Sequence, residues 1–226
     1  MSSHNTRPRA LGAVKIRRRP AAAASVTAGL ALTVILGSTS APATADSVIK
    51  TSPVGENPGS IAVNTATDTA YVSTVEGIFS VRGGGVGGGK VYSPGDYSSR
   101  LAVNSVTNKI YASDADSVVV IDGVSQATTV VPIGGSTSAI AVNDKTNKVF
   151  VGTDNGLTII DGASNTSTAV PITAGVQEID VNTTTNKAYV RSAGTVKVID
   201  GSGKVTSPTG TSGILSIAVN AKLNKI

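Results

Sequence analysis

The chain has 226 residues, no cysteine, one histidine and a formal net charge of +5. The absence of cysteine excludes a disulfide framework, thiolate metal sites and a lipoprotein anchor. Six of the basic residues lie among the first 45 positions, which contain no acid, and the remaining residues carry 13 basic and 14 acidic side chains. The positive charge therefore comes from one segment, and it does not indicate nucleic-acid binding.

Residues 1–45 have the three-part pattern of an export signal. A basic segment ends at Arg17-Arg18-Arg19, an apolar run extends from Ala21 to Leu36, and the small-residue motif Ala43-Thr44-Ala45 follows. The apolar run is shorter than the ~20 residues that span a membrane. We therefore predict a signal peptide and a secreted or cell-surface protein. An uncleaved anchor is the alternative, and both Sec and Tat export stay open.

Downstream of this segment the sequence repeats. The stem Ile-Ala-Val-Asn, or a close variant, occurs five times and ends at Asn64, Asn104, Asn143, Asn182 and Asn220. Successive asparagines are 40, 39, 39 and 38 residues apart. A period of ~40–45 residues is typical of a four-stranded propeller blade.

The third copy illustrates why each repeat is predicted to form four short strands. The expected strands cover 139–143, 149–153, 157–160 and 168–172. They are rich in Val, Ile and Thr, which favour antiparallel sheet, and no 3.6-residue apolar period follows residue 46. The turns between them contain Asn, Asp and Gly, which tolerate the backbone conformations of tight hairpins.

Other elements recur in register with the stem. They are a Thr-Asn-Lys turn, an aromatic residue usually followed by valine, and a closing Val-Ile-Asp-Gly or Ile-Ile-Asp-Gly. Together they resemble the YVTN-type β-propeller repeat family over roughly residues 48–226. The resemblance implies an all-β propeller with four-stranded antiparallel blades, in a secreted or surface-layer protein of bacteria or archaea. It implies no particular activity.

The repeat region begins and ends with incomplete copies. Residues 48–59 correspond to the end of a repeat, and the fifth copy stops at Ile226. The expected domain, 46–226, holds four complete blades and one strand at each end. The blades are placed at about 60–93, 100–133, 139–172 and 178–208, with a fifth starting at 214–226. Unpaired strand edges are unfavourable, so we interpret the chain as part of a longer propeller, seven-bladed by the family resemblance. A short product that assembles with another copy is the alternative.

Two recurrent or unusual features have structural interpretations. Four aromatic residues share one repeat position, and their apolar neighbours predict a core between blades in preference to a ligand-stacking ring. They are Tyr71, Tyr111, Phe150 and Tyr189. The glycine-rich run 84–90 matches the first part of a phosphate-binding loop, but Val91 follows where such a loop has Ser or Thr. Strands are expected on both sides, so the run is predicted to be a hairpin.

Side chains for catalysis are scarce. The sole histidine, His4, lies in the predicted signal peptide, which removes histidine-based triads and His-ligated metals from the mature chain. Asp122, Asp161 and Asp200 each precede glycine and are expected to be turn residues. The first copy has Arg82 in their place. No catalytic residue, metal or cofactor is predicted.

The loops of a propeller fall on two faces, and here their charges differ. The face with the second–third strand turns and the blade crossings is acidic by five charges, and the opposite face is basic by four. This polarity is either accidental or functional, through a cation or cationic partner on the acidic face or an anionic cell-wall polymer on the basic face. The candidate binding residues are Asp114, Asp116, Asp154, Glu178, Asp180 and Arg191.

The aspartates among these candidates suggest two specific hypotheses. Asp114, Asp116 and Asp154 would be the ligands if the acidic face binds a hard cation such as calcium. Asp180 replaces the alanine found in the other copies of the stem. We expect Asp180 to be solvated in the central channel, to pair with Arg191 or to contact a ligand.

These observations favour a secreted or surface-associated, non-catalytic binding scaffold. Its partner would be a protein or a cell-wall polymer, with no nucleic acid and no membrane-spanning segment in the mature chain. Two alternatives stay open. One is a carboxylate-dependent hydrolase or lyase whose active site needs further blades, and the other is a structural surface-layer component.

Overall fold

The protein is all-β and is built from separate four-stranded antiparallel sheets. The computed structural model describes residues 25–27, 31–33, 52–83, 88–93, 100–172 and 174–226. Within these ranges there are four sheets of four strands, one from each complete repeat, and no α-helix. A separate strand pair joins β1 (Ser25–Thr27) to β2 (Ala31–Thr33). The remainder of the expected signal peptide lies outside the described residues.

Every blade has the same strand order, from the inner to the outer strand. Blade one contains β3 (Ile61–Asn64), β4 (Thr69–Thr74), β5 (Gly77–Arg82) and β6 (Lys90–Tyr92). Blade two contains β7 (Leu101–Asn104), β8 (Lys109–Asp114), β9 (Ser117–Asp122) and β10 (Thr128–Pro132). Blade three contains β11 (Thr137–Asn143), β12 (Lys148–Thr153), β13 (Gly156–Asp161) and β14 (Thr166–Val170). Blade four contains β15 (Val176–Asn182), β16 (Lys187–Ser192), β17 (Thr195–Asp200) and β18 (Val205–Thr206).

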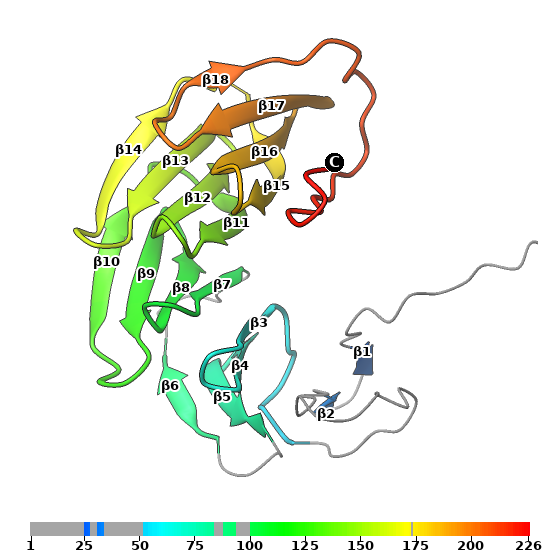
Figure 1. The fold of residues 1–226 in the computed structure, drawn as a ribbon. Helices are drawn as coiled ribbons and strands as arrows, with labels where there is room; N and C mark the ends of the chain where they lie inside the picture. The colour runs from blue at the N-terminus through cyan, green and yellow to red at the C-terminus, as the bar shows by residue number, and fades with distance from the viewer. Residues whose placement is uncertain (1–24, 28–30, 34–51, 84–87, 94–99, 173) are drawn as a thin grey trace, which may run out of the picture.

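The blades follow one another around an arc, with their inner strands toward its concave side (Figure 1). Strands β7, β11 and β15 lie on that side, whereas β10 and β14 form the outer margin. The inner strands of neighbouring blades are in contact, from β3 to β7, from β7 to β11 and from β11 to β15. This is the arrangement of a β-propeller whose ring is open within the described chain, as the repeat predicts.

The hydrophobic core lies between blades, because each sheet buries one face against the next. Tyr111 of blade two packs with Val149 and Val151 of blade three, and Phe150 of blade three packs with Ala188 and Val190 of blade four. Tyr111 and Phe150 are both fully buried. Burial of such a side chain contributes about 1.5–3 kcal/mol. The prediction that the shared aromatic position is a core position is confirmed.

The segment that connects the outer strand of one blade to the inner strand of the next is also similar from copy to copy. Ile133 and Ile172, each directly after a proline, are buried in the cores next to blades three and four. Val54, directly after Pro53, is buried against Val72 and Val81 of blade one. The prediction that residues 48–59 correspond to the end of a repeat is therefore supported where the segment is described.

Two element boundaries differ from the sequence-based expectation. The fourth strand of the third copy was expected at 168–172, but it covers Thr166–Val170. Pro171 has no N–H to donate, so the strand ends before it, and Thr166 instead pairs with Asp161.

In the fifth copy, residues 214–219 form no strand, and the copy contributes a turn closed by the pair Asn220–Lys225. The inner strand of each complete blade is paired with a second strand, and residues 214–219 have no such neighbour among the described residues.

The hairpin prediction for the glycine-rich run is supported by its flanks. Strands β5 and β6 pair antiparallel, with Ile78 opposite Tyr92 and Phe79 opposite Lys90. Residues 84–87, in the middle of the run, lie outside the described residues. In the part of the chain that the structure describes, no helix is long and apolar enough to cross a membrane.

Candidate functional site

Each sheet has two ends with different chemistry. We call one end the turn end, because it carries the first–second and third–fourth strand connections of every blade. Its described connections are 65–68, 83 with 88–89, 105–108, 123–127, 144–147, 162–165, 183–186, 201–204 and 221–224. The opposite end, the crossing end, carries the second–third strand turns and the passages from blade to blade.

A buried asparagine network links neighbouring blades at the turn end. In blade three, the Oδ1 atom of Asn143 accepts hydrogen bonds from the backbone N–H groups of Lys145 (3.2 Å) and Thr146 (3.3 Å). Its Nδ2 atom donates to Oδ1 of Asn186 in blade four, at 2.8 Å. The same side-chain bond joins Asn64 to Asn108, Asn104 to Asn147 and Asn182 to Asn224, at 2.7, 2.9 and 3.0 Å. The stem asparagine therefore closes its own turn and also holds the next blade.

The accepting asparagines need two unusual local features. Asn108, Asn147 and Asn186 have φ values of 53°, 53° and 54°, a left-handed conformation that asparagine tolerates better than most residues. Their side chains lie against the glycines of the Asp-Gly motifs, where a Cβ atom would collide with them. These glycines are Gly123, Gly162 and Gly201. The Asp-Gly motif is thus part of the inter-blade contact as well as a hairpin turn.

The aspartates of these motifs are turn residues, as predicted. Oδ1 of Asp161 accepts hydrogen bonds from the N–H groups of Ala163 and Ser164, at 2.9 and 3.2 Å. Lys148, which lies opposite Asp161 across the strand pair, forms an ion pair with it at 2.5 Å. The hydrogen bond from Lys148, with those from the two N–H groups, lowers the pKa of Asp161 to about 2. Asp122 and Asp200 accept similar bonds, and serine and backbone donors lower the pKa of both.

Five lysines at or beside the turn end have no such partner. Their side chains are exposed and form no ion pair or hydrogen bond with a described residue. They are Lys145, Lys187, Lys204, Lys222 and Lys225. Unlike Lys109, whose Nζ atom donates to the carbonyl of Gly162 at 2.6 Å, these ammonium groups remain available to solvent and to ligands.

Three of the predicted binding residues, Asp114, Asp116 and Asp154, lie at the crossing end. Asp116 is exposed, and its carbonyl accepts bonds from the N–H groups of Ile133 and Gly134. Oδ1 of Asp154 accepts the N–H of Ser136 at 3.0 Å. Asp114 is close enough to contribute to the raised pKa of Tyr92, for which burial is the larger cause. Within the described ranges, no three His, Cys, Asp or Glu side chains are grouped to hold a metal ion, so these aspartates do not form the suggested calcium cluster.

The other three predicted residues connect blade four to the fifth copy. Oε1 and Oε2 of Glu178 accept bonds from the hydroxyl of Ser216 (2.9 Å) and the N–H of Ile217 (3.1 Å). Oδ2 of Asp180 accepts the N–H of Val219 at 2.7 Å. Arg191 pairs with Glu178 at 3.3 Å, because these two residues are opposite each other in the strand pair. Arg191 therefore pairs with Glu178 and not with Asp180, which contacts the next repeat. Solvation of Asp180 in the central channel stays a prediction.

Because Glu178 accepts hydrogen bonds from the fifth copy, we expect it to hold that copy against blade four. Burial opposes the charged form of Glu178, but the hydrogen bonds from Ser216, Ile217 and Arg191 outweigh it and lower the pKa. A lowered carboxyl pKa gives stability that is present above the pKa of the unfolded chain and is lost as the pH falls through the lower, folded value. We expect Glu178→Ala to accelerate hydrogen exchange at the Ile217 amide about tenfold or more, because that N–H loses its acceptor.

The control for this measurement is Glu76→Ala, which removes an exposed carboxylate that has no hydrogen-bond or ion-pair partner in the described chain. It should leave the Ile217 amide unchanged. In the unmodified protein, exchange at Ile217 corrected for intrinsic pH dependence should rise as the pH falls below the ordinary glutamate pKa of about 4.3. Equal protection in the Glu178→Ala variant would show that the fifth copy is held by other contacts.

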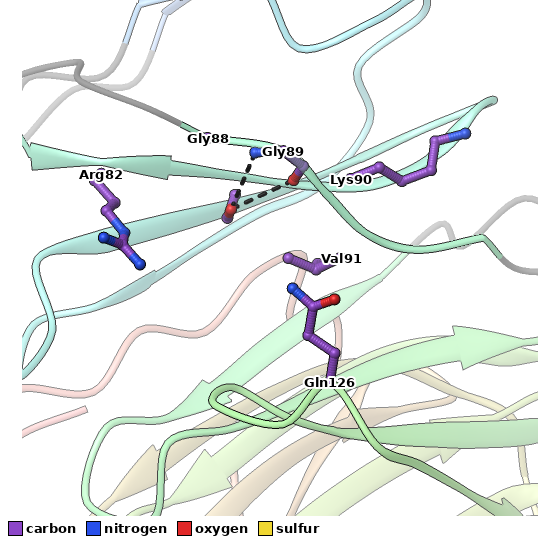
Figure 2. A pocket seen from close by; sticks show the side chains of 7 residues that line it. Arg82, Gly88, Gly89, Lys90, Val91 and Gln126 are labelled. Atoms are coloured by element: carbon purple, nitrogen blue, oxygen red, sulfur yellow. Dashed lines mark hydrogen bonds between the residues drawn. The ribbon is translucent and has the colours of Figure 1, made fainter.

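A cavity of about 360 Å³ lies at the turn end between blades one and two. Ser80, Arg82, Lys90 and Val91 line it from blade one, with the backbone of Gly88 and Gly89, and Gln126 lines it from blade two. Figure 2 shows that the Lys90 side chain extends away from Arg82 and Gln126. Its ammonium group lies 5.6 Å from the centre of the Phe79 ring. Arg82 is visible in the sequence as a departure from the repeat, but no sequence pattern indicates this cavity.

Comparisons with known proteins support the fold. No protein-family model matches the chain, and no curated protein matches it. Apo AztD from Citrobacter koseri is similar in structure, with a TM-score of 0.56 and 19% identity over 69% of this chain and 49% of that one. Hydrazine synthase from Kuenenia stuttgartiensis also has a TM-score of 0.56, with 18% identity over 66% of this chain and 48% of that one. The RRP9 WD40 repeats have a TM-score of 0.55 and 11% identity, over 66% and 50%.

These structures are β-propellers, and this chain spans about half the length of each. Identity at this level establishes a shared fold and leaves ligands and reactions open. The chain is therefore a β-propeller with four complete blades in the described region.

Proposed function

We propose that this protein is an exported, non-catalytic binding scaffold whose turn end contacts an anionic polymer of the cell surface. The five exposed lysines of the turn end carry this proposal, because their ammonium groups project from one end of consecutive blades without a partner among the described residues. A row of unpaired cations attracts an extended polyanion more strongly than a small ligand, since each contact displaces a counterion. The apolar run and small-residue motif before Asp46 support export.

The acidic residues of the crossing end are less available to a ligand than the lysines of the turn end. Its acidic candidates are largely engaged within the protein, Glu178 with Arg191 and the fifth copy, and Asp154 with the N–H of Ser136. The repeated polar residues at the turn end also have structural roles, because the asparagines join blades and the aspartates close hairpins. The groups of the turn end that remain available for recognition include the five exposed lysines, which differ between copies: Lys145 and Lys222 occupy a stem-turn position that is Ala66 in the first copy.

Binding to poly(glycerol phosphate), a polymer with regularly spaced phosphates, tests the proposal. The variant Lys145→Gln/Lys187→Gln/Lys222→Gln is expected to lower its affinity about tenfold or more at low ionic strength, because each lost phosphate contact removes one released counterion. The affinity of the unmodified protein should fall steeply with added salt, and the slope of log affinity against log salt should be smaller in the variant. Calorimetric titration measures both quantities.

Two controls separate the turn end from the overall charge. Glu56→Gln/Glu76→Gln changes the net charge through exposed residues at the crossing end, and it is expected to change the affinity less than about twofold. Lys197→Gln removes a lysine whose Nζ atom is bonded to Ser207 at 3.0 Å, and it should also have little effect. Equal binding by the unmodified protein and the triple lysine variant would contradict the proposed role of the turn end.

A further inference from the structure

Blade one differs from the other blades at a cross-strand position where each of them places a lysine opposite an aspartate. In blades two, three and four, a lysine at the start of the second strand lies opposite an aspartate at the end of the third strand. The residues at these positions are Lys109 and Asp122, Lys148 and Asp161, and Lys187 and Asp200. Among the described residues, only Lys148 and Asp161 of these form an ion pair. In blade one, the same cross-strand pair is Thr69 with Arg82. Blade one therefore has a cation, Arg82, at this position, and no carboxylate stands opposite it in the strand pair.

The surroundings of Arg82 supply further hydrogen-bond donors. Arg82 is exposed and forms no hydrogen bond or ion pair within the described part of the chain. The cavity that it lines also contains the Ser80 hydroxyl and the Gln126 carboxamide, and no carboxylate is found among its described lining residues. Asp68, in the first–second strand turn of blade one, packs its carboxylate against Gly83. The described wall of the cavity thus combines an unpaired guanidinium, the Lys90 side chain and two neutral polar groups, and it holds no carboxylate.

We propose that this cavity is a phosphate-binding subsite, in which Arg82 and Gln126 hold one phosphate group between blades one and two. A guanidinium presents a planar set of donors that matches two phosphate oxygens, and the Gln126 amide can donate to a third. Ser80 already exchanges weak bonds with Gly89, at 3.3 and 3.4 Å, and it can turn its hydroxyl toward the ligand. The subsite deepens the proposed function and rests on it for the source of the phosphate, a phosphodiester of the polymer.

The subsite itself is tested with inorganic phosphate at an ionic strength of about 0.15 M, where non-specific attraction between exposed charges is screened beyond ~8 Å. Saturable chemical-shift changes are expected at the side-chain amide of Gln126 and at the backbone of Ser80. Arg82→Gln should weaken phosphate binding about tenfold or more, since hydrogen bonds to charged groups are the strong ones. Lys197→Gln is the charge-matched control, because it removes an equal charge from a residue that does not line the cavity and whose Nζ atom is bonded to Ser207 at 3.0 Å. It should change the affinity less than about twofold.

A polymer comparison identifies the source of the phosphate. Arg82→Gln should weaken binding of poly(glycerol phosphate) more than binding of polygalacturonate, which has carboxylates at comparable density. Absence of a saturable phosphate response at Gln126 would overturn the subsite, whatever the polymer does. Equal loss for both polymers, or for neither, would overturn the assignment of the phosphate to a phosphodiester of the polymer. A local phosphate response together with polymer binding that is insensitive to the triple lysine substitution would support the subsite and refute the proposed function of the turn end.

Discussion

Replacing Asn143 by alanine is expected to lower the free energy of unfolding by about 3 kcal/mol. The side chain is fully buried and makes three hydrogen bonds, two inside its own turn and one to the next blade. Alanine leaves the N–H groups of Lys145 and Thr146 without their acceptor and removes the donor to Asn186. Urea unfolding followed by far-UV circular dichroism measures the loss.

The aspartate variant separates the two functions of this side chain. Asn143→Asp keeps an oxygen that accepts the two turn N–H groups, but it brings a carboxylate oxygen against Oδ1 of Asn186 in place of a donor. We therefore expect a substantial loss at neutral pH that diminishes as the pH falls, because protonation of the introduced carboxylate would restore a donor toward Asn186. The stability of the alanine variant should show no such additional pH dependence.

Asn155→Ala is the matched control for the Asn143 variants. Asn155 is an exposed hairpin asparagine in the same blade, with one hydrogen bond from Nδ2 to the carbonyl of Gly134 at 3.0 Å. Its replacement should cost less than about 1 kcal/mol, the usual net value of one hydrogen bond. If Asn143→Ala cost no more than this control, the asparagine network would not hold the blades together.

The architecture could be predicted from the sequence because its signal is local and repeated. The stem asparagines are 40, 39, 39 and 38 residues apart, and each complete copy follows its stem with a turn and an aromatic residue. Five copies in register define strand order and the core face even where a single copy is ambiguous. The aromatic residues consequently lie in the core as expected, including Tyr111 and Phe150.

The roles of individual polar residues were harder to predict, because their partners lie one repeat away. From the sequence, Asn143 is an ordinary turn residue. In the structure its amide donates to Asn186, which lies 43 residues later in the chain. Asp180 was compared with alanines at the same position of other copies, whereas its contact is the N–H of Val219 in the next copy. Equivalent positions of the repeat therefore do not reveal contacts between positions that are not equivalent.

The candidate binding residues stay a prediction, since binding depends on which charges remain unpaired. Counting charges along the loops led to acidic binding candidates, but Glu178 is paired with Arg191 in the structure. The departure at Arg82 was visible in the repeat alignment. Its meaning depends on the cavity shared with Gln126, and a cavity between two blades has no local sequence pattern.

Replacing Gly162 by alanine is expected to cost about 3 kcal/mol, comparable with the overpacking of a filled core. A Cβ atom there would collide with Oδ1 of Asn147 and lie 2.7 Å from the Tyr111 hydroxyl. Tyr111 is fully buried, and the N–H of Gly162 donates to the carbonyl of Asn147 at 2.8 Å, so neither neighbour can move away freely. Gly89→Ala is the control, because no atom lies within 4 Å of its added methyl group. It should stay within about 0.5 kcal/mol of the unmodified protein.

A second substitution tests whether the collision with Asn147 causes the loss. Asn147→Gly removes the obstructing side chain and suits the positive φ of 53°, but it also removes the acceptor of the Asn104 amide at 2.9 Å. Alone it is expected to cost about 1–2 kcal/mol. The double variant should be at least about 1 kcal/mol more stable than the sum of the two single losses predicts, since one of the two close contacts is then gone. Strict additivity in this cycle would show that the collision with Asn147 does not cause the loss, and it would leave the collision with the Tyr111 hydroxyl as the cause.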